Sequence, residues 1–354
     1  MKTLTVALPG REYDILIERG LLAQAGERCR AALPRAAKLA VVSDSNVVPL
    51  YGEALLQSLT AAGFEARLFT VPAGEHSKNA GQLSRLWEGF MSFGLTRTDA
   101  VVALGGGVVG DLAGFAAATI LRGVDLVQIP TTLLAQVDSS VGGKVAIDLE
   151  AGKNLAGSFY QPKLVLMDPA ALDTLSDATF SDGMAEVIKY GLLDNVPFFN
   201  DLMEKPAKEQ YERVISTCVE MKKQVVLSDE FDRGARQKLN LGHTIGHAVE
   251  QCSGFTLLHG ECVAIGMAVI TRAAVKKDFC AKETLDAVEK ILKLYDLPDQ
   301  TTYSTDELLN VALADKKVAN GKISLIVPEA VGKCSILPVP AEALRDWMQA
   351  GGIV

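Results

Sequence analysis

Residues 99–111 read DAVVALGGGVVGD, an apolar run that ends in a glycine-rich turn. The run Ala100–Leu104 predicts a buried strand, and small residues over Leu112–Arg122 predict a helix directly after the turn. Three glycines satisfy the G-x-G-x-x-G spacing in this strand-turn-helix setting: Gly105, Gly107 and Gly110. Glycines there let backbone N–H groups and the helix dipole approach a pyrophosphate without Cβ collisions. Tight packing alone would explain the turn, but its setting favours nucleotide binding.

Strands and helices alternate around this turn. The other predicted strands are Leu39–Val42, Ala66–Val71, Leu126–Ile129 and Leu164–Met167, and a helical pattern covers Tyr51–Ala62. Such alternation indicates a parallel sheet. In the usual Rossmann domain the glycine turn follows the first strand, whereas here a β-α-β unit precedes it. We therefore expect an N-terminal α/β domain with a mostly parallel, Rossmann-like sheet of atypical topology.

Beyond Asp168–Pro169 the pattern becomes helical. The predicted helices are Phe180–Leu193, Tyr211–Ser228, Ala235–Cys252, Cys262–Lys276 and Lys282–Leu294. A small strand pair is expected near Ile323–Val327. The sequence thus predicts two domains, an α/β domain over residues 1–168 and a mostly α-helical domain over residues 169–354.

Composition excludes several classes of protein. A formal charge of -8 argues against nucleic-acid or anionic-membrane partners, which need a basic surface. The longest apolar stretch, Val101–Leu121, contains Asp111 and several glycines, so it is not a membrane span. The apolar run at the start is too short for a signal peptide. Six cysteines without a C-x-x-C pair indicate buried reduced thiols, and we expect a cytoplasmic protein.

Polar side chains follow several of the predicted strands. The spacing from the glycine turn nominates Asp125 for a cofactor ribose, yet Asp44 and Asn46 are equally well placed, and spacing does not choose between them. Thr131 and Thr132 follow a strand, where capping of the next helix is a sufficient explanation. The segments Asp138–Lys144 and Gly152–Asn154 concentrate small donors and cations, which suits a phosphate-binding loop or a solvated surface loop equally.

Three of the four histidines fall between residues 243 and 259. Histidine is the commonest neutral metal ligand, so the cluster predicts a divalent-metal site. In a continuous helix, four polar residues would share one face: Arg236, Asn240, His243 and His247. With Gly242 and Gly246 beside them, these residues indicate a lined cleft rather than an exposed polar face.

His243 and His247 are spaced like the paired ligands of a zinc protease. Thr244 stands where such a protease needs glutamate, which disfavours that class. The spacing leaves the third ligand open among Glu250, Glu261 and a remote carboxylate such as Glu186. Lys189, one turn from Glu186, suggests an acid-base pair, although both residues, like Lys222, are also typical of surface ion pairs.

Taken together, these segments resemble the 3-dehydroquinate synthase family of sugar phosphate cyclases over most of the chain. The resemblance is carried by Pro72–Lys78, Leu104–Asp111, Arg122, Pro130–Thr132, Asp138–Lys144, Gly152–Asn154, Gly183–Lys189, Leu239–His247 and His259–Glu261. It has two departures from the family pattern: Asp232 replaces a usual glutamate near the active-site lysine, and Ala178–Thr179 replaces an Arg-Glu pair in what we expect to be a loop.

The resemblance implies a ligand set and two groups of binding residues. Zinc, or cobalt, would be held by Glu186, His243 and His259, leaving His247 to face the substrate. NAD would be bound by Asp44, Asn46, Glu75, Lys78, Gly105, Gly106, Gly107, Asp111, Thr131, Thr132, Asp138, Lys144 and Lys153. The substrate would meet Asp138, Lys144, Asn154, Lys189, Lys222, Arg236, Asn240 and His247. Arg122 would reach a phosphate across the interface of a homodimer.

The implied reaction converts 3-deoxy-D-arabino-heptulosonate 7-phosphate to 3-dehydroquinate and phosphate, by transient oxidation with NAD, phosphate elimination, re-reduction and aldol closure. Three alternatives stay open: a sister cyclase acting on sedoheptulose 7-phosphate or glucose 6-phosphate, a metal-dependent polyol dehydrogenase, and a binding module in which the histidines only brace the fold. Arg236 favours a substrate that carries a carboxylate.

Overall fold

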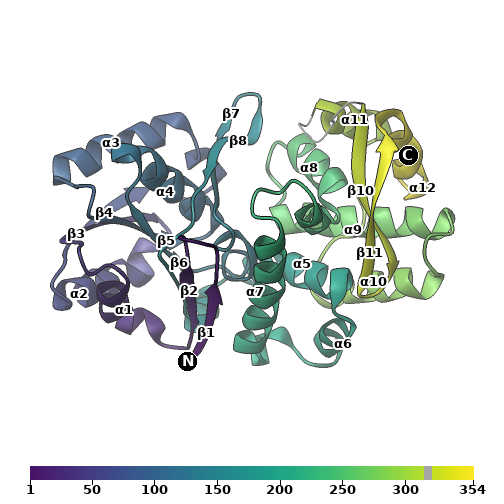
Figure 1. Ribbon diagram of the computed structural model, residues 1–354. Helices are drawn as coiled ribbons and strands as arrows, with labels where there is room; N and C mark the ends of the chain where they lie inside the picture. The colour runs from purple at the N-terminus through teal and green to yellow at the C-terminus, as the bar shows by residue number, and fades with distance from the viewer. Residues whose placement is uncertain (315–320) are drawn as a thin grey trace. The chain divides into compact units, whose positions relative to one another are not determined.

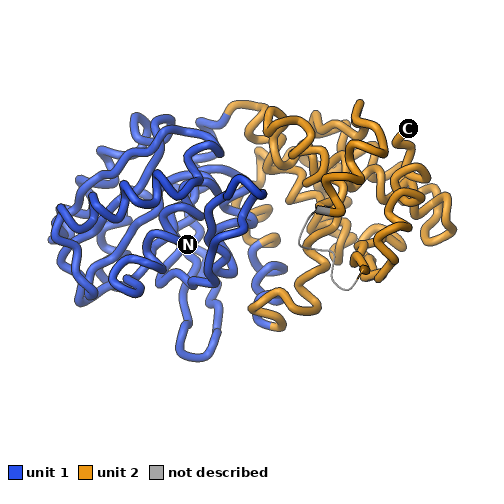
Figure 2. Tube along the Cα trace, turned by 90° about the horizontal axis from the view of Figure 1, so that it is seen from above, with its two compact units in different colours: residues 1–175, 219–227 blue, residues 176–218, 228–354 orange. Residues whose placement is uncertain are grey.

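The structure is a computed structural model that describes residues 1–314 and 321–354. The chain divides into two compact units (Figures 1 and 2). Unit 1 contains Met1–Leu175 and Val219–Leu227, and unit 2 contains Ser176–Cys218 and Ser228–Val354. Within the described ranges, no helix has the length and apolar character needed to span a bilayer.

A seven-stranded sheet forms the centre of unit 1. In spatial order its strands are β1 (Lys2–Val6), β2 (Tyr13–Ile17), β9 (Leu164–Met167), β6 (Asp125–Pro130), β5 (Ala100–Gly105), β3 (Lys38–Asp44) and β4 (Glu65–Val71). Only the pairing of β1 with β2 is antiparallel. The predicted mostly parallel sheet is therefore confirmed.

Helices cover both faces of this sheet (Figure 1). On one face, α1 (Ala25–Ala32) and α2 (Glu53–Ala61) contribute Cys29, Leu55 and Leu59 to an apolar core. On the other, α3 (Ala80–Phe93) and α4 (Gly107–Thr119) contribute Phe90 and Leu112 to a second core. Strands buried on both faces read as continuous apolar runs, which explains the pattern of β5.

The order of the strands places a switch point between β3 and β5. From β3 the chain passes through α2 to β4 on one side, and from β5 it passes through α4 to β6 on the other. Because these two helices lie on opposite faces, the connections diverge at the carboxyl ends of β3 and β5. In open α/β sheets, ligands bind in the crevice formed at such a point.

A β-hairpin replaces part of the expected phosphate loop. Strands β7 (Lys144–Leu149) and β8 (Gly152–Phe159) pair antiparallel, so Gly152–Asn154 begins a strand and the prediction of a loop there was wrong. Gly157 permits the pairing, because a Cβ at that position would lie 2.3 Å from the backbone oxygen of Val145. The hairpin projects from unit 1 in Figure 1.

Unit 2 is mostly helical, as predicted. Its helices are α5 (Asp177–Asp194), α6 (Val196–Glu204), α8 (His243–Cys252), α9 (His259–Lys276), α10 (Lys282–Leu294), α11 (Thr305–Ala314) and α12 (Leu344–Ala350). Helix α7 (Tyr211–Ser228) has its residues 219–227 grouped with unit 1. The expected strand pair is β10 (Lys322–Ala330) with β11 (Lys333–Pro340), and α12 follows it.

The predicted continuous helix over Ala235–Cys252 was wrong. Ala235–Asn240 forms a 3₁₀ turn, and α8 begins only at His243. Gly242 breaks the helix with a left-handed φ of 79°, which glycine adopts without the steric cost of a Cβ. Arg236 and Asn240 therefore do not share a helical face with His243 and His247.

Candidate functional site

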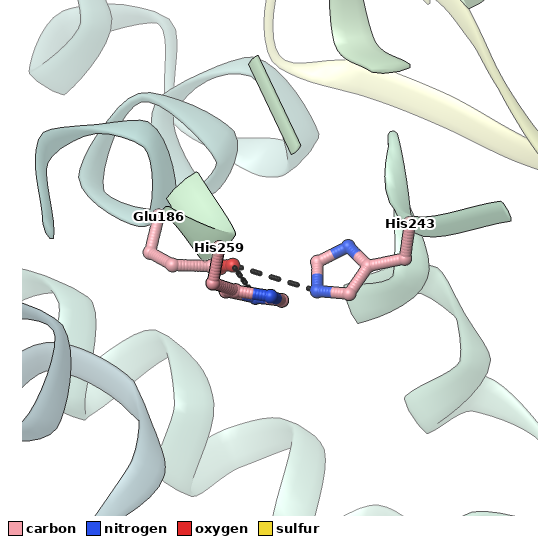
Figure 3. Close-up of side chains that lie close together, drawn as sticks. All are labelled: Glu186, His243 and His259. Atoms are coloured by element: carbon pink, nitrogen blue, oxygen red, sulfur yellow. Dashed lines mark ion pairs between the residues drawn. The ribbon is translucent and has the colours of Figure 1, made fainter. Parts of the chain in front are cut away.

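Glu186, His243 and His259 converge within unit 2 (Figure 3). Oε1 of Glu186, on α5, lies 3.4 Å from Nε2 of His243, on α8, and 3.4 Å from Nε2 of His259, on α9. Two ligand atoms at about 2.1 Å from a tetrahedral zinc ion are about 3.4 Å apart. The three side chains thus have the spacing of ligands around one divalent cation.

The tautomer of His243 suits a ligand. Its Nδ1 lies 3.0 Å from the backbone oxygen of Leu241. A carbonyl oxygen only accepts, so Nδ1 of the neutral ring carries the hydrogen and Nε2 keeps its lone pair for a metal.

The carboxylate of Glu186 is buried with the ammonium of Lys189. Each side chain is 1% exposed, and the two form an ion pair one helical turn apart. Both carboxylate oxygens of Glu186 are inaccessible to solvent. A buried carboxylate is costly unless positive charge neutralises it. The Lys189 ammonium supplies part of this charge, and a divalent cation bound by Glu186 would supply more. The alternative of an ordinary surface ion pair was therefore wrong.

Glycines allow the three helices that carry Glu186, His243 and His259 to pack with their backbones in contact. A Cβ at Gly260 would lie 1.9 Å from the backbone oxygen of Asp182, so α5 and α9 meet where His259 begins its helix. A Cβ at Gly246 would lie 2.8 Å from the oxygen of Cys262, and one at Gly266 would lie 1.9 Å from the oxygen of Gly242. The distance between the ligands is therefore set by main-chain packing.

Asp182 adds a polar contact at the same place. Its carboxylate accepts a 2.5 Å hydrogen bond from the backbone N–H of Gly260, and burial raises the pKa of Asp182 to about 6. This residue was not among the sequence predictions. The signal was its position one helical turn before Glu186, on the same face of α5.

We expect Gly260→Ala to destabilise unit 2 by about 1–3 kcal/mol, because the new methyl group has to displace backbone rather than a flexible side chain. It also separates His259 from Glu186, so metal affinity falls. Chemical denaturation and metal titration measure the two effects. Gly52→Ala is a matched control: its helical φ is -59° and its nearest side-chain atom would be 3.4 Å away, so stability should hold or rise.

His259 also lies near a second carboxylate, that of Glu250. Burial lowers the pKa of His259, but hydrogen bonds to Glu186 and Glu250 outweigh this effect and raise the pKa to about 10. Metal binding requires the neutral ring, so a cation and a proton compete for this histidine.

The other polar residues predicted for unit 2 are distributed around this group. The ring of His247 lies 5.3 Å from that of His243 and 5.9 Å from that of His259, measured between centroids. Arg236 is 2% exposed and donates a 2.6 Å hydrogen bond from Nη1 to the backbone oxygen of Glu230. Glu261 accepts a hydrogen bond from the backbone of Leu258 at the start of α9, which makes it a helix cap.

The structure locates the two departures from the family pattern. Asp232 lies in the segment between α7 and the 3₁₀ turn and has a left-handed φ of 56°. Ala178 and Thr179 lie in the first turn of α5, where the Thr179 N–H bonds the Ser176 hydroxyl. The expectation that this pair belongs to a loop was wrong.

Ten of the thirteen residues predicted for NAD, all except Asp138, Lys144 and Lys153, lie along the carboxyl edge of the sheet in unit 1. They follow four neighbouring parallel strands: Asp44 and Asn46 at β3, Glu75 and Lys78 after β4, Gly105, Gly106, Gly107 and Asp111 at β5, and Thr131 and Thr132 after β6. The helix α4 begins at Gly107, earlier than predicted, and no side chain caps it. Its first N–H groups thus face the switch point, as a pyrophosphate site requires.

Lys78 connects several of these residues. It is 4% exposed, and its Nζ lies 2.7 Å from Asp111 Oδ2 and contacts the side-chain oxygen of Asn154. Burial lowers the pKa of Lys78, but the Asp111 and Glu75 carboxylates more than compensate and raise it. Lys153 pairs with Glu75 at 3.0 Å. The hairpin is thereby tied to the residues after β4.

The remaining predicted residues of unit 1 lie in three places. Lys222, on α7, pairs with Asp138 and donates a 2.6 Å hydrogen bond to its backbone oxygen. Lys144 is exposed at the start of β7. Arg122 is also exposed and has a left-handed φ of 69°.

Comparison with known proteins identifies the family of this chain. Residues 68–182 match the 3-dehydroquinate synthase N-terminal model, and residues 183–318 match the 3-dehydroquinate synthase C-terminal model. A relative from Clostridium acetobutylicum, a 3-dehydroquinate synthase, is 43% identical and covers 99% of both chains.

Two solved structures are also similar. A 2-deoxy-scyllo-inosose synthase complexed with carbaglucose-6-phosphate, NAD+ and Co2+ is 26% identical, with a TM-score of 0.87 over 98% of this chain and 99% of that one. A 2-epi-5-epi-valiolone synthase from Streptomyces hygroscopicus, with NAD+ and Zn2+ bound, is 28% identical, with a TM-score of 0.86 over 96% of each chain. Matches to both family models and to a relative over nearly its whole length place this chain in the 3-dehydroquinate synthase family.

Proposed function

We propose that this chain is a carbon-oxygen lyase that converts 3-deoxy-D-arabino-heptulosonate 7-phosphate to 3-dehydroquinate and phosphate, a step toward aromatic amino acids through the shikimate pathway. The observation that carries the proposal is the buried group of Glu186, His243 and His259. Membership of the 3-dehydroquinate synthase family supports the assignment of this reaction to the site.

The proposal gives each group of residues a task. Glu186, His243 and His259 would hold Zn2+ or Co2+, and the residues along the carboxyl edge of the sheet in unit 1 would hold NAD. Together, the cation and NAD supply a transient oxidation of a substrate hydroxyl that is reversed within the turnover, so that NAD is not consumed. We assign NAD binding to a domain over residues 1–168, and metal and substrate binding to a domain over 169–354.

Cationic side chains would neutralise the substrate. Arg236 presents a planar guanidinium, which suits a carboxylate in a bidentate arrangement. Lys189 is buried beside Glu186, so its ammonium is a strong donor to negative charge that develops on the substrate. Asn240 and His247 would bind substrate oxygens, and His247 would also transfer a proton.

Residues of unit 1 complete the assignment. Lys222 and Asp138 support each other through their ion pair, and we assign both to the substrate with Lys144 and Asn154. Asp138, Lys144 and Lys153 would also contact the cofactor. A cytoplasmic homodimer in which Arg122 binds phosphate across the interface stays a prediction.

Sequence similarity separates this proposal from a sister cyclase. The chain is 43% identical to a 3-dehydroquinate synthase, against 26% and 28% for cyclases with other products. Phosphate release from three substrates tests the choice: we expect turnover with the heptulosonate and none with sedoheptulose 7-phosphate or glucose 6-phosphate. Turnover only with a sugar that lacks a carboxylate would refute the assignment.

The same assay, with NADH absorbance recorded alongside phosphate, distinguishes the proposed cyclase from a polyol dehydrogenase. A dehydrogenase accumulates NADH in proportion to its product, whereas the proposed enzyme regenerates NAD in each turnover. We therefore expect steady NADH absorbance while phosphate is released. Stoichiometric NADH without phosphate would support the dehydrogenase.

A further inference from the structure

Glu250 lies on the side of His259 that faces away from Glu186. Oε2 of Glu250 is 3.5 Å from Nδ1 of His259, while Nε2 of the same ring is 3.4 Å from Glu186 Oε1. The side chain of Glu250 is 6% exposed, so its charge is little screened by water. The imidazole of His259 thus has one carboxylate at each nitrogen.

The two carboxylates have different tasks when a metal is bound, because only Glu186 belongs to the ligand group with His243. When a cation held by Glu186 takes the lone pair of Nε2, the remaining hydrogen of the ring is on Nδ1, where the Glu250 carboxylate accepts it. His243 is set up in the same way by the backbone oxygen of Leu241. The acceptor differs, because Glu250 adds a full negative charge that makes the ring more basic and a cation more stable.

The position of Glu250 is rigid. It lies on α8 one helical turn after Gly246, where α8 approaches the backbone of α9 so closely that a Cβ would meet the Cys262 oxygen at 2.8 Å. His259 starts α9, so the contact between the two helices brings the carboxylate to the ring.

We propose that Glu250 is a positioning residue of the metal centre, which fixes the tautomer and orientation of His259 and strengthens its bond to the cation. The inference rests on the proposed function for its metal centre, but it concerns a residue outside the ligand set of Glu186, His243 and His259.

A second cation is the competing explanation. His247, Glu250 and His259 also have ligand atoms within 4.8 Å of one another. A neutral imidazole has only one lone pair in the ring plane, and Nε2 of His259 is already directed at Glu186. With one cation already at Nε2, a second cation at Nδ1 would need the ring to lose both protons, so the geometry favours Glu250 as a hydrogen-bond acceptor.

The test is the affinity of the purified, metal-free chain for Zn2+, measured by competition with a chromogenic chelator. For Glu250→Gln we expect about 10–100-fold weaker binding, the usual effect of losing such a partner. The wild type should bind one cation per chain at this site. Glu283→Gln removes the same charge at the exposed start of α10 and should leave the affinity unchanged.

Further measurements distinguish a loss of metal binding from a loss of folding. Thermal melting of the metal-free proteins should give similar midpoints for Glu250→Gln and the wild type, which separates weaker binding from unfolding. If Glu250→Gln does not fold, Glu250→Asp keeps the charge but shortens its reach, and its affinity should still fall. Unchanged affinity in the folded variant overturns the inference, and so do two cations in the wild type of which the variant loses one. Absence of any binding by the wild type instead refutes the proposed metal centre.

Discussion

Glu186→Gln is expected to abolish tight binding of the divalent cation and, with it, catalysis. Glutamine keeps the size of the side chain but has no charge to offer at the position 3.4 Å from both histidines. Loss of a ligand should weaken binding by more than the 10–100-fold typical of an outer partner. A metal supplies several kcal/mol of transition-state stabilisation, so phosphate release should fall by about 10³-fold or more.

This variant also leaves the ammonium of Lys189 buried without its carboxylate. Breaking a buried ion pair from one side costs about 3–5 kcal/mol, so denaturation should show a lower free energy of unfolding. His243→Ala is the companion variant, because it removes a ligand without stranding a charge. Metal analysis after dialysis gives the result, and full metal content in both variants would contradict the ligand assignment.

His247→Ala, unlike Glu186→Gln, should keep its bound metal and its free energy of unfolding but lose activity. His247 shares α8 with His243, but its nitrogens are not in the group formed by Glu186, His243 and His259. If it binds substrate and moves a proton, its removal lowers the rate by about 10²–10⁴-fold.

The control for this variant is Gln251→Ala, at an exposed position one helical turn further along α8. Metal content, thermal melting and phosphate release are measured on both proteins. Retained activity in His247→Ala would remove its proposed role, and loss of metal would place it among the ligands.

The fold was predictable where apolar periodicity is strong. The predicted helices Tyr211–Ser228 and Lys282–Leu294 coincide with α7 and α10, and the parallel sheet follows from apolar runs such as Ala100–Leu104. Periodicity failed over Ala235–Cys252, because an apolar pattern continues through a residue whose backbone is not helical. Gly242 has a left-handed φ and lies against the backbone of α9, a tertiary contact that periodicity does not report.

Only part of the candidate site could be predicted from the spacing of residues in the sequence. The histidine cluster indicated a metal, but the spacing favoured His243 and His247 as paired ligands on one helix. Tertiary contact instead places Glu186 between His243 and His259, and only the family resemblance had pointed to that set. Asp182 contacts the backbone of Gly260 and Glu250 contacts the ring of His259, and both contacts join different helices, so spacing along the sequence does not show them.

Phosphate release from the heptulosonate substrate, measured before and after removal of the divalent cation by a chelator, tests the proposed function most directly. We predict that the chelated protein loses activity and that Zn2+ or Co2+ restores it, with no net change in NADH. An undiminished rate in chelated protein shown by metal analysis to be metal-free would contradict a metal-dependent cyclase.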